Sequence, residues 1–358
     1  MIPLETVAIT TPRKIAACPP YLPPWWLRSG LAMTLYTALW ASRTWEKTIV
    51  AAEPPYRDLL FAGAGEVPLF GRMAIPERSR GTVIGTYGIT GDLDNQWFLR
   101  LLGRKAFAQG YAVVLFDWRA HGKTAELSPT LTSDGLYEGT DFLYILEQAS
   151  QLGCPAPFCF TGFSLGGQLA LWGAKAAQER DDFGGAAVIC PSLDSNRSLT
   201  YLEQAPLGKY LERAIAQELQ RLAYRLREFH PDHIDPAAIE RAQTIRQFDQ
   251  ELVIAGLGFP SVEAYYEASS ALPLLPHLTK PTLILYAADD PLFSPAIVPD
   301  LQQICGMNPN LELILTAHGG HVGYYNSRAG QRMAGDADPW WAWNRVLQWW
   351  DGVVDQSR

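Results

Sequence analysis

The sequence predicts an α/β protein in which helices cover both faces of a mostly parallel central sheet. Two observations support this fold class. From Gly81 onward, short runs rich in β-branched and aromatic residues alternate with segments of helical periodicity. The composition, with 48% hydrophobic and 18% charged residues, is typical of a globular chain with a substantial core. We therefore expect one large α/β domain that carries an insertion.

The expected elements follow one another in an order that suits such a sheet. A leading hairpin is expected at residues 57–62 and 67–75. The later strands are expected at 81–89, 111–118, 158–163, 186–190, 281–287 and 311–316. The helices between them are expected at 95–109, 134–151, 165–177 and 294–304.

Residues 193–277 break this alternation, because they contain no strand-like run. Leu211, Ile215, Leu219, Leu222 and Leu226 form a helical apolar stripe, and Asp235 followed by proline is a helix-start signal. We interpret the segment as a helical cap over the site, the alternative being helices that only cover hydrophobic surface. The expected organisation is an N-terminal segment and first part of the core at 1–192, the cap at 193–277, and the second part of the core at 278–358.

The C-terminal segment 339–353 repeats apolar residues at three- and four-residue steps. Trp340, Trp343, Leu347 and Trp350 mark this repeat, which predicts a final helix that packs its aromatic face on the sheet. The segment lacks the basic face of helices that lie on membranes.

Charge and cysteine usage exclude some classes of function. A net charge of -8 and a pI near 5.3 give no basic field for a phosphate backbone, so no nucleic-acid partner is expected. The five cysteines form no Cys-x-x-Cys pair, which suits a reducing compartment, and Cys159 and Cys190 read as core residues. We therefore expect a cytoplasmic protein.

No targeting or membrane-spanning segment is expected either. The first 14 residues lack the basic start, apolar run and cleavage site of a signal peptide. The apolar stretch 25–40 is interrupted by Arg28 and Gly30 and is shorter than the ~20 residues that a bilayer span needs.

The sharpest local motif is Gly162-Phe163-Ser164-Leu165-Gly166-Gly167. It follows an apolar strand-like run and precedes a helical one. A nucleophilic serine uses such a turn because the sharp bend projects its hydroxyl beyond the sheet, and flanking glycines allow close backbone approach. The bare pattern is weak, but its position between strand and helix predicts that Ser164 is a nucleophile.

A serine nucleophile needs a histidine base that is oriented by a carboxylate. Asp289 and Asp290 follow the expected strand 281–287, and His318 and His321 follow the strand 311–316. We predict Asp290 as the acid and Asp289 as a cap or turn residue, with the swapped assignment as the alternative. His321 is the predicted base, because two preceding glycines let its loop bend toward Ser164.

The remaining histidines are interpreted as structural, and no cofactor or metal ion is expected. His121 is expected to hold a loop. His230 and His233 lie in HPDHID, which could imitate a metal site, but the bracketing prolines favour a turn.

A serine hydrolase also needs two N–H donors for the oxyanion. One is expected from the backbone of Leu165, directly after the nucleophile. The other is expected from Ile89, in the Tyr87-Gly88-Ile89-Thr90-Gly91 stretch where the expected strand 81–89 ends.

Together these segments resemble the YheT-like branch of the α/β-hydrolase superfamily, a group of predicted esterases and lipases related to the animal abhydrolase-domain lipases. The resemblance extends over most of the chain. It is carried by Pro23 to Leu27 with Gly30 and Thr34, Gly162 to Gly167, Gly258-Phe259, Tyr265 to Ser270, Ala288 to Pro291, and Gly319 to Gly323. It implies an α/β-hydrolase fold, and supports Ser164, Asp290 and His321 as the catalytic triad.

Two departures from this branch bear on the pocket. The usual His-Leu-Gln before the early threonine is Leu31-Ala32-Met33 here, and the usual His-Gly turn near the oxyanion site is Tyr87-Gly88.

The resulting hypothesis is a metal-independent serine esterase or lipase that acts on a small-molecule acyl ester, often lipid-derived in this family. The alternatives are an acyltransferase that uses the same triad, an amide-cleaving enzyme, and a non-catalytic binding or scaffold protein. Peripheral membrane contact through Trp25 and Trp26, the oligomeric state and the acyl chain length are left open by the sequence.

Overall fold

The computed structural model describes residues 7–9 and 18–356. Most of the first 14 residues, in which the sequence analysis expects no signal peptide, lie outside the described residues. The described chain contains a nine-stranded sheet in the order β1-β9-β8-β7-β6-β4-β5-β3-β2. The strands are β1 (Val7–Ile9), β2 (Arg57–Ala62), β3 (Pro68–Ala74), β4 (Thr82–Thr86), β5 (Ala112–Phe116), β6 (Phe158–Phe163), β7 (Phe183–Ile189), β8 (Thr282–Ala287) and β9 (Leu311–Thr316).

The helices of the N-terminal segment and the core alternate with these strands. They are α1 (Gly30–Tyr36), α2 (Ser42–Thr44), α3 (Trp97–Ala108), α4 (Thr124–Leu127), α5 (Glu138–Gln151), α6 (Leu165–Ala177), α13 (Ile297–Met307), α14 (Arg328–Ala334) and α15 (Trp341–Gln356). Six more helices lie between β7 and β8: α7 (Ser195–Gln204), α8 (Gly208–Phe229), α9 (Pro236–Arg241), α10 (Ile245–Phe248), α11 (Ile254–Leu257) and α12 (Val262–Ser269).

The sheet confirms the predicted α/β-hydrolase architecture. The six strands β4 to β9 pair in parallel with one another. The β2–β3 hairpin joins one side antiparallel to β5, and β1 lies antiparallel to β9 at the opposite edge. Because parallel strands are covered on both faces, they read as continuous apolar runs, and all six residues of β6 and of β8 are buried.

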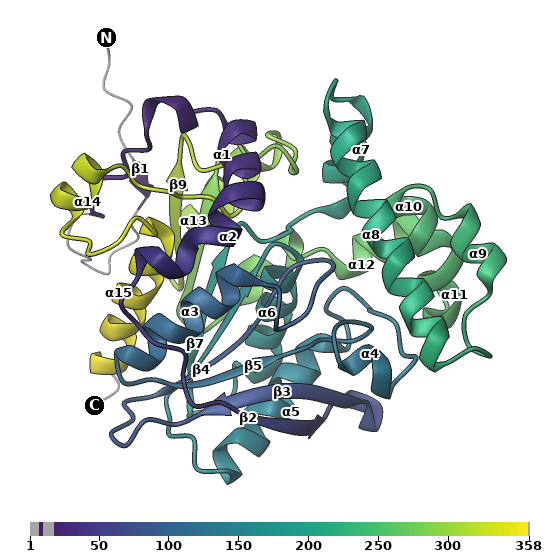
Figure 1. Ribbon diagram of the computed structural model, residues 1–358, viewed down its shortest axis with the longest axis horizontal. Coiled ribbons are helices and arrows are strands. Elements are labelled where there is room, and N and C mark those ends of the chain that lie inside the picture. Colours follow the sequence, from purple (N-terminus) through teal and green to yellow (C-terminus); the bar gives the residue numbers. More distant parts are fainter. Residues whose placement is uncertain (1–6, 10–17, 357–358) are drawn as a thin grey trace.

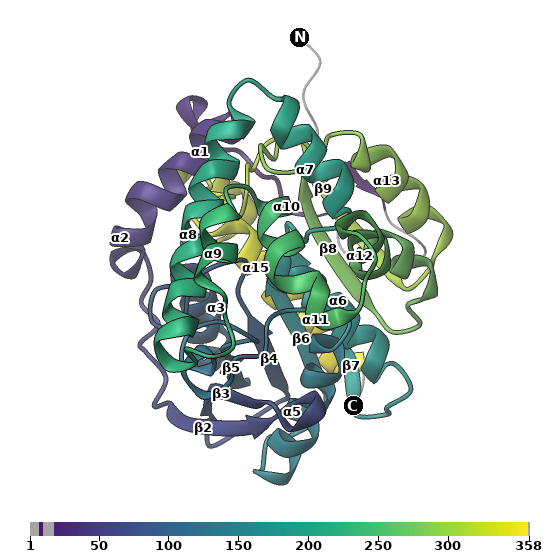
Figure 2. The same ribbon diagram turned by 90° about the vertical axis from the view of Figure 1, so that its right-hand side faces the viewer.

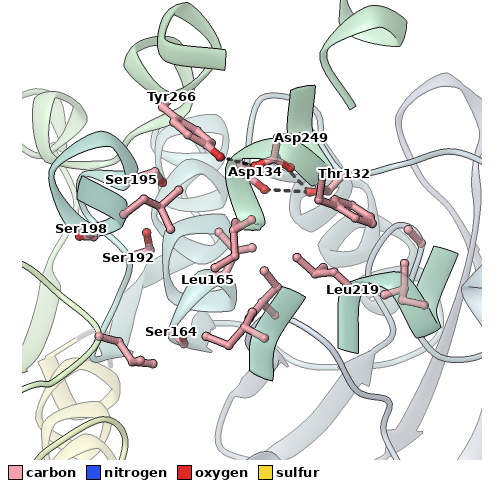
Figure 3. A pocket seen from close by; sticks show the side chains of 18 of the residues that line it. Thr132, Asp134, Ser164, Leu165, Ser192, Ser195, Ser198, Leu219, Asp249 and Tyr266 are labelled. Atoms are coloured by element: carbon pink, nitrogen blue, oxygen red, sulfur yellow. Dashed lines mark hydrogen bonds between the residues drawn. The ribbon is translucent and has the colours of Figure 1, made fainter. Parts of the chain in front are cut away.

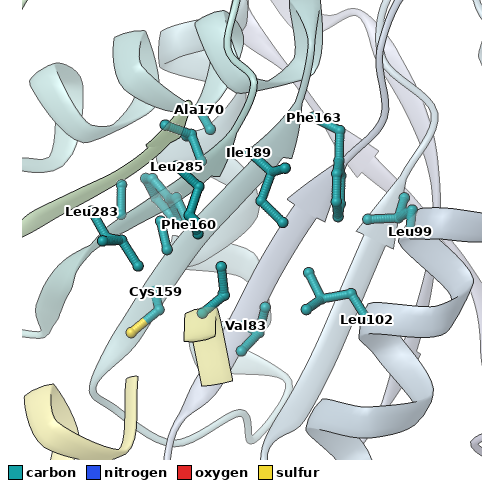
Figure 4. Packing of buried hydrophobic residues seen from close by; sticks show 14 of the residues in the cluster. Val83, Leu99, Leu102, Cys159, Phe160, Phe163, Ala170, Ile189, Leu283 and Leu285 are labelled. Carbon is teal, nitrogen blue, oxygen red and sulfur yellow. The ribbon is translucent and has the colours of Figure 1, made fainter. Parts of the chain in front are cut away.

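Alternate residues of β6 show how the two faces are covered. Phe163 contacts Phe98 of α3 and Trp343 of α15, with ring centroids 4.9 and 5.8 Å apart. Phe160 contacts Phe142 of α5 at 4.9 Å. Since Phe160 and Phe163 differ by an odd number of positions, they point to opposite faces of the sheet. Helices α3 and α15 therefore cover one face and α5 the other, and Figure 4 shows the buried side chains between the layers.

The C-terminal helix α15 confirms the predicted aromatic packing. Trp340, Trp343 and Trp350 are fully buried. The Trp343 indole N–H donates to the Phe98 carbonyl at 2.9 Å, which ties α15 to the start of α3. The aromatic repeat at the end of the chain therefore belongs to the core.

The six helices α7 to α12 form a body of their own beside the sheet, at the right of Figure 1. Their core contains Ala223, Leu226, Ile239, Phe248 and Tyr265, all buried. The apolar stripe expected between Leu211 and Leu226 lies on α8 and faces this core. No strand occurs in the segment, as predicted.

The apolar N-terminal stretch forms short helices instead of one long one. A 3-10 turn at Trp25–Leu27 precedes α1, and a π-helical turn at Thr37–Ala41 follows it. Within residues 7–9 and 18–356, no helix has the length and apolar character needed to cross a bilayer.

Candidate active site

Ser164 stands on a strained turn between β6 and α6. Its backbone has φ 55° and ψ -125°, a conformation that side-chain-bearing residues rarely adopt. Neighbouring glycines make the turn possible. A Cβ on Gly162 would lie 1.9 Å from the Gly166 carbonyl oxygen, and one on Gly166 would lie 2.1 Å from the Tyr87 carbonyl oxygen. The Gly-x-Ser-x-Gly spacing is therefore a steric requirement of this bend.

His321 and Asp290 lie in line with the Ser164 hydroxyl. His321 Nε2 is 2.9 Å from Ser164 Oγ, and His321 Nδ1 is 2.8 Å from Asp290 Oδ2. Asp290 is buried and His321 is largely covered. Because Asp290 is an acceptor, these partners indicate that Nδ1 carries the ring proton and that Nε2 accepts from the serine.

The two adjacent aspartates have different surroundings. Asp290 Oδ2 faces His321, and Asp290 Oδ1 accepts the Leu292 N–H at 2.9 Å. Asp289 Oδ1 instead accepts the Gly320 N–H at 2.9 Å, while its Oδ2 lies 3.6 Å from His318 Nδ1. Burial raises the pKa of Asp289, and the Gly320 N–H and His318 oppose this shift. Of the two carboxylates, the one near His321 is Asp290, and Asp289 braces the glycine loop.

The N-terminal helix α1 supports the loop that carries His321. The sequence analysis did not identify this supporting role. Thr34 Oγ1 accepts the His321 N–H at 2.8 Å and donates to the Gly30 carbonyl at 2.8 Å. The approach is close, because a Cβ on Gly320 would lie 2.4 Å from the Gly30 carbonyl oxygen, and one on Gly30 would lie 1.8 Å from the Asp289 carbonyl oxygen. Gly30 and Thr34 belong to the resemblance noted above, and that was the only sequence signal for this role.

Ile89 and Leu165 both line the pocket beside Ser164. Leu165 is the first residue of α6, so its N–H has no acceptor within the helix. The turn before Ile89 lies against the serine, since a Cβ on Gly88 would lie 2.9 Å from Ser164 Cβ. Both segments that are expected to supply oxyanion donors are therefore next to Ser164.

His121 holds the loop that carries Ile89. Its Nδ1 lies 2.8 Å from the Arg119 carbonyl, and its Nε2 accepts the Thr90 N–H at 3.1 Å. The ring stacks on Trp118 with centroids 3.6 Å apart. Burial lowers the pKa of His121 to about 3, so the ring is neutral at physiological pH. The predicted loop-holding role is confirmed.

Tyr87 and Asp117 also support the loop that carries Ile89. The buried Tyr87 O–H donates to Asp117 Oδ1 at 2.5 Å, and Asp117 also accepts the backbone N–H groups of Leu93 and Lys123. Burial raises the pKa of Asp117 to about 6, and these three donors oppose the shift. The tyrosine that replaces the usual histidine at this turn therefore anchors it through a carboxyl group.

The site opens into a pocket between the sheet and the helical insertion, with about 870 Å³ of empty space when the solvent in its open mouth is counted. Figure 3 shows Ser164 at one side of this space, with Leu165 and Leu219 above it. The walls are mainly aliphatic and aromatic, and the lining contains no lysine or arginine. From the insertion the lining residues are Ser195, Ser198, Leu199, Leu202, Ile215, Leu219, Leu222, Ile245, Phe248, Asp249 and Tyr266.

Two buried carboxyl groups lie at the far side of the pocket from Ser164 in Figure 3. Asp249 accepts a hydrogen bond from the Tyr266 O–H, and Asp134 accepts one from the Thr132 O–H at 3.2 Å. Burial raises the pKa of both carboxyls, and each raised pKa is increased further by a neighbouring acidic group. A negatively charged substrate group would meet no basic partner in this lining.

The described residues give little support for a metal ion at the site. One group with suitable atoms occurs among them, formed by Cys190, Asp290 and His321. Metal binding needs the thiolate, but burial raises the pKa of the Cys190 thiol, and the imidazole and carboxylate already bind each other. The other suspected metal segment is a turn, in which His230 Nε2 lies 3.0 Å from the Ala125 carbonyl.

Known proteins share sequence similarity with most of this chain. The sequence profile described as "Alpha/beta hydrolase family" matches residues 88–337. The Synechocystis sp. protein named "Putative esterase slr0264" is 52% identical over 354 residues, which cover 94% of this chain and 96% of that protein. The human "Phospholipase ABHD3" is 24% identical over 305 residues, covering 81% of this chain and 73% of that protein.

Solved structures show the same fold at low sequence identity. The esterase Pf2001 of Pyrococcus furiosus superposes with a TM-score of 0.55 at 17% identity and covers 94% of this chain and 99% of that one. The acylaminoacyl peptidase of Pyrococcus horikoshii gives a TM-score of 0.52 at 14% identity, over 87% of this chain and 43% of that one.

Proposed function

Because this chain belongs to the α/β hydrolase family, we propose that it is a serine esterase with Ser164, His321 and Asp290 as its triad. The observation that carries the proposal is the continuous hydrogen-bond chain from Ser164 Oγ through the His321 ring to Asp290. A serine hydroxyl becomes an effective nucleophile only with such a base in reach. The name of the Synechocystis relative points to the same reaction.

In the proposed reaction, Ser164 Oγ attacks the ester carbonyl carbon while its proton passes to His321 Nε2. The imidazolium that forms is stabilised by Asp290. The N–H groups of Leu165 and Ile89 would bind the oxyanion of the tetrahedral intermediate. Collapse expels the alcohol, which takes the proton from His321, and leaves an acyl-enzyme. Water then repeats the sequence and releases the acid, with no metal or cofactor taking part.

The pocket supports an apolar acyl group as the part of the substrate that is bound. Its walls are largely aliphatic and aromatic, and no cationic side chain lines them. We therefore propose an uncharged acyl ester, which includes lipid-derived esters, as the substrate. We also propose that residues 193–277 act as a cap, since α7, α8, α10 and α12 supply about half of the lining.

The first test is the pair of variants Ser164→Ala and Ser192→Ala. Both serines line the pocket, but only Ser164 contacts His321. We expect Ser164→Ala to lower kcat for short p-nitrophenyl esters by a factor on the order of 10⁴ or more, because the hydroxyl forms the covalent bond. Ser192→Ala should keep activity within a few fold, and circular dichroism should show both variants folded.

Hydrolysis at the wild-type rate by Ser164→Ala would refute the proposed nucleophile. Labelling of the wild type by a fluorophosphonate probe, lost in Ser164→Ala, distinguishes an enzyme from a non-catalytic binding protein. Product analysis with an added alcohol or thiol distinguishes hydrolysis from acyl transfer, because a transferase would form a new ester or thioester.

A further inference from the structure

The N-terminal helical segment exposes a set of large apolar side chains. Trp25 is 80% exposed, Leu39 60% and Trp40 61%. We call this set the tryptophan face, and its members are Leu22, Trp25, Trp26, Leu35, Leu39 and Trp40. Single exposed apolar residues are ordinary, whereas exposed apolar side chains that gather on one part of a surface mark interaction sites.

The tryptophan face is held in place by the fold beneath it. Trp26 packs edge-on against Tyr36 at 5.1 Å, and Tyr36 packs against Tyr325 at 5.4 Å. The intervening residues Leu27 and Met33 are buried. The exposed rings are therefore presented by an ordered segment whose other side belongs to the core.

The charges around this face are basic. Arg28, Arg43 and Lys47 are exposed, and none of them forms an ion pair with a residue in the described part of the chain. Glu46, the acidic residue in the stretch 18–50, is bound to Arg100 and Arg104. On a chain with a net charge of -8, this segment carries unneutralised positive charge.

A second element exposes apolar and basic side chains at the same end of the molecule. Leu207 is 54% exposed and Tyr210 63%, at the tip where α7 turns into α8. Lys209 and Arg213 beside them are exposed and form no ion pair with a described residue. Figures 1 and 2 both show this α7–α8 tip and α1 at the upper end of the molecule.

Each of these elements also contacts the candidate active site with its inner side. Thr34 of α1 binds the His321 N–H, while α7 and α8 contribute Ser195 and Ile215 to the pocket lining. A surface bound at this end would therefore lie next to the pocket.

We propose that the tryptophan face and the α7–α8 tip dock on the surface of a bilayer that contains anionic lipid. Tryptophan and tyrosine rings favour the membrane–water interface, and leucine side chains enter the acyl boundary. Basic residues near an anionic surface are attracted to it and strengthen the attachment. Docking is peripheral, because no described helix can span the bilayer. A symmetric dimer formed through this face would bring the basic side chains of both copies together, so the charge pattern favours lipid over a second copy of this chain.

The test is co-sedimentation of the full chain with vesicles of phosphatidylcholine alone or mixed with phosphatidylglycerol. The variant Ser164→Ala serves as the background, so that binding is measured whether or not the protein is an esterase. We expect at least tenfold tighter binding to the mixed vesicles, weakened by high salt. Trp25→Ser with Trp40→Ser should lower this binding at least tenfold, as should Arg43→Glu with Lys47→Glu.

The matched control is Leu60→Ser, which removes an apolar side chain of 62% exposure from β2, at the opposite end of the molecule. It should leave vesicle binding unchanged. The proposal is overturned if the protein binds neither kind of vesicle. It is equally overturned if the variant with Trp25→Ser and Trp40→Ser binds the vesicles as tightly as the control. It is also overturned if the protein is a dimer without lipid and the tryptophan variants are monomers, which would make the face a self-association surface.

Discussion

Asp117 makes the stability of the site loop depend on pH. Its pKa is raised by burial from the usual 3.8 to about 6, so the fold favours the protonated carboxyl. Its contribution to the free energy of unfolding is therefore greatest below pH 4, falls between pH 4 and 6, and is constant above. We expect the wild type to lose about 3 kcal/mol from this group over that interval.

The variant Asp117→Asn should remove this dependence. It lowers stability overall, because an amide placed here would turn an N–H₂ group toward a backbone N–H that now donates to the carboxyl. Its unfolding free energy relative to wild type should nevertheless improve as pH rises from 4 to 6.5. Urea unfolding at several pH values measures the difference, and a constant difference would contradict the assigned cause.

Some residues of the candidate site could be identified from the sequence, and others could not. Ser164 and His321 could be proposed because local glycines and the order of motifs mark them, and their oxygen and nitrogen lie 2.9 Å apart. The alternation of side chains at a strand end indicates only that one of Asp289 and Asp290 faces the histidine. The preference for Asp290 rested on the superfamily habit of placing the acid two residues before an apolar residue, here Leu292, and this left the swapped assignment open. Thr34 could not be derived, since its partner His321 lies 287 positions away.

At the scale of elements, the contact between α1 and the His321 loop predicts the effect of Thr34→Val. Valine keeps the shape but cannot accept the His321 N–H or donate to the Gly30 carbonyl. The loop should then hold the imidazole less well, and we expect kcat for a p-nitrophenyl ester to fall about tenfold with a smaller change in KM.

Thr34→Ser is the matched control, because it restores the hydroxyl and should recover most of the rate. A purely structural role predicts a different pattern. In that case Thr34→Val and Thr34→Ser would both lower the melting temperature and would have similar kcat values, since serine also removes the methyl group.

The sequence predicted some boundaries of strands and helices correctly and missed others. Strands β6 and β9 and helix α6 occupy the residues expected, because apolar runs and glycines delimit them. Helix α5 begins at Glu138, four residues later than expected. The reason is that Asp134 and Gly135 adopt positive φ, and the Glu138 side chain accepts the Ser133 and Gly135 N–H groups in front of the helix. The pairing of β1 with β9 has no local signal, since three residues carry too little pattern.

For the whole molecule, the parallel sheet could be predicted, whereas the shape of the pocket could not. The sheet follows from repeated strand and helix patterns along the chain. The pocket depends on how the six helices of the insertion pack over Ser164. Their own core combines buried residues of different helices, such as Leu226 of α8 and Ile239 of α9, and no periodicity encodes how these helices are placed relative to one another.

The pocket predicts that α8 sets the acyl length. Leu219 is buried and, like Leu165 and Ser164, it lines the pocket drawn in Figure 3. We expect Leu219→Trp to fill part of this space, so that kcat/KM for a palmitoyl ester falls at least tenfold relative to a butyryl ester. Rates over a graded series of p-nitrophenyl esters measure this ratio.

The control for acyl length is Leu226→Trp, because Leu226 lies seven residues further along α8 and is buried in the core of the insertion, outside the pocket lining. Overpacking there should cost stability by about 1–3 kcal/mol. It should also leave the ratio between long and short esters near the wild-type value. If Leu219→Trp lowered both esters equally, the acyl chain would have to lie elsewhere, and α8 would act only as part of the packed insertion. A selective loss of the long ester therefore locates the chain between the sheet and the insertion, on the side of Ser164 that α8 covers.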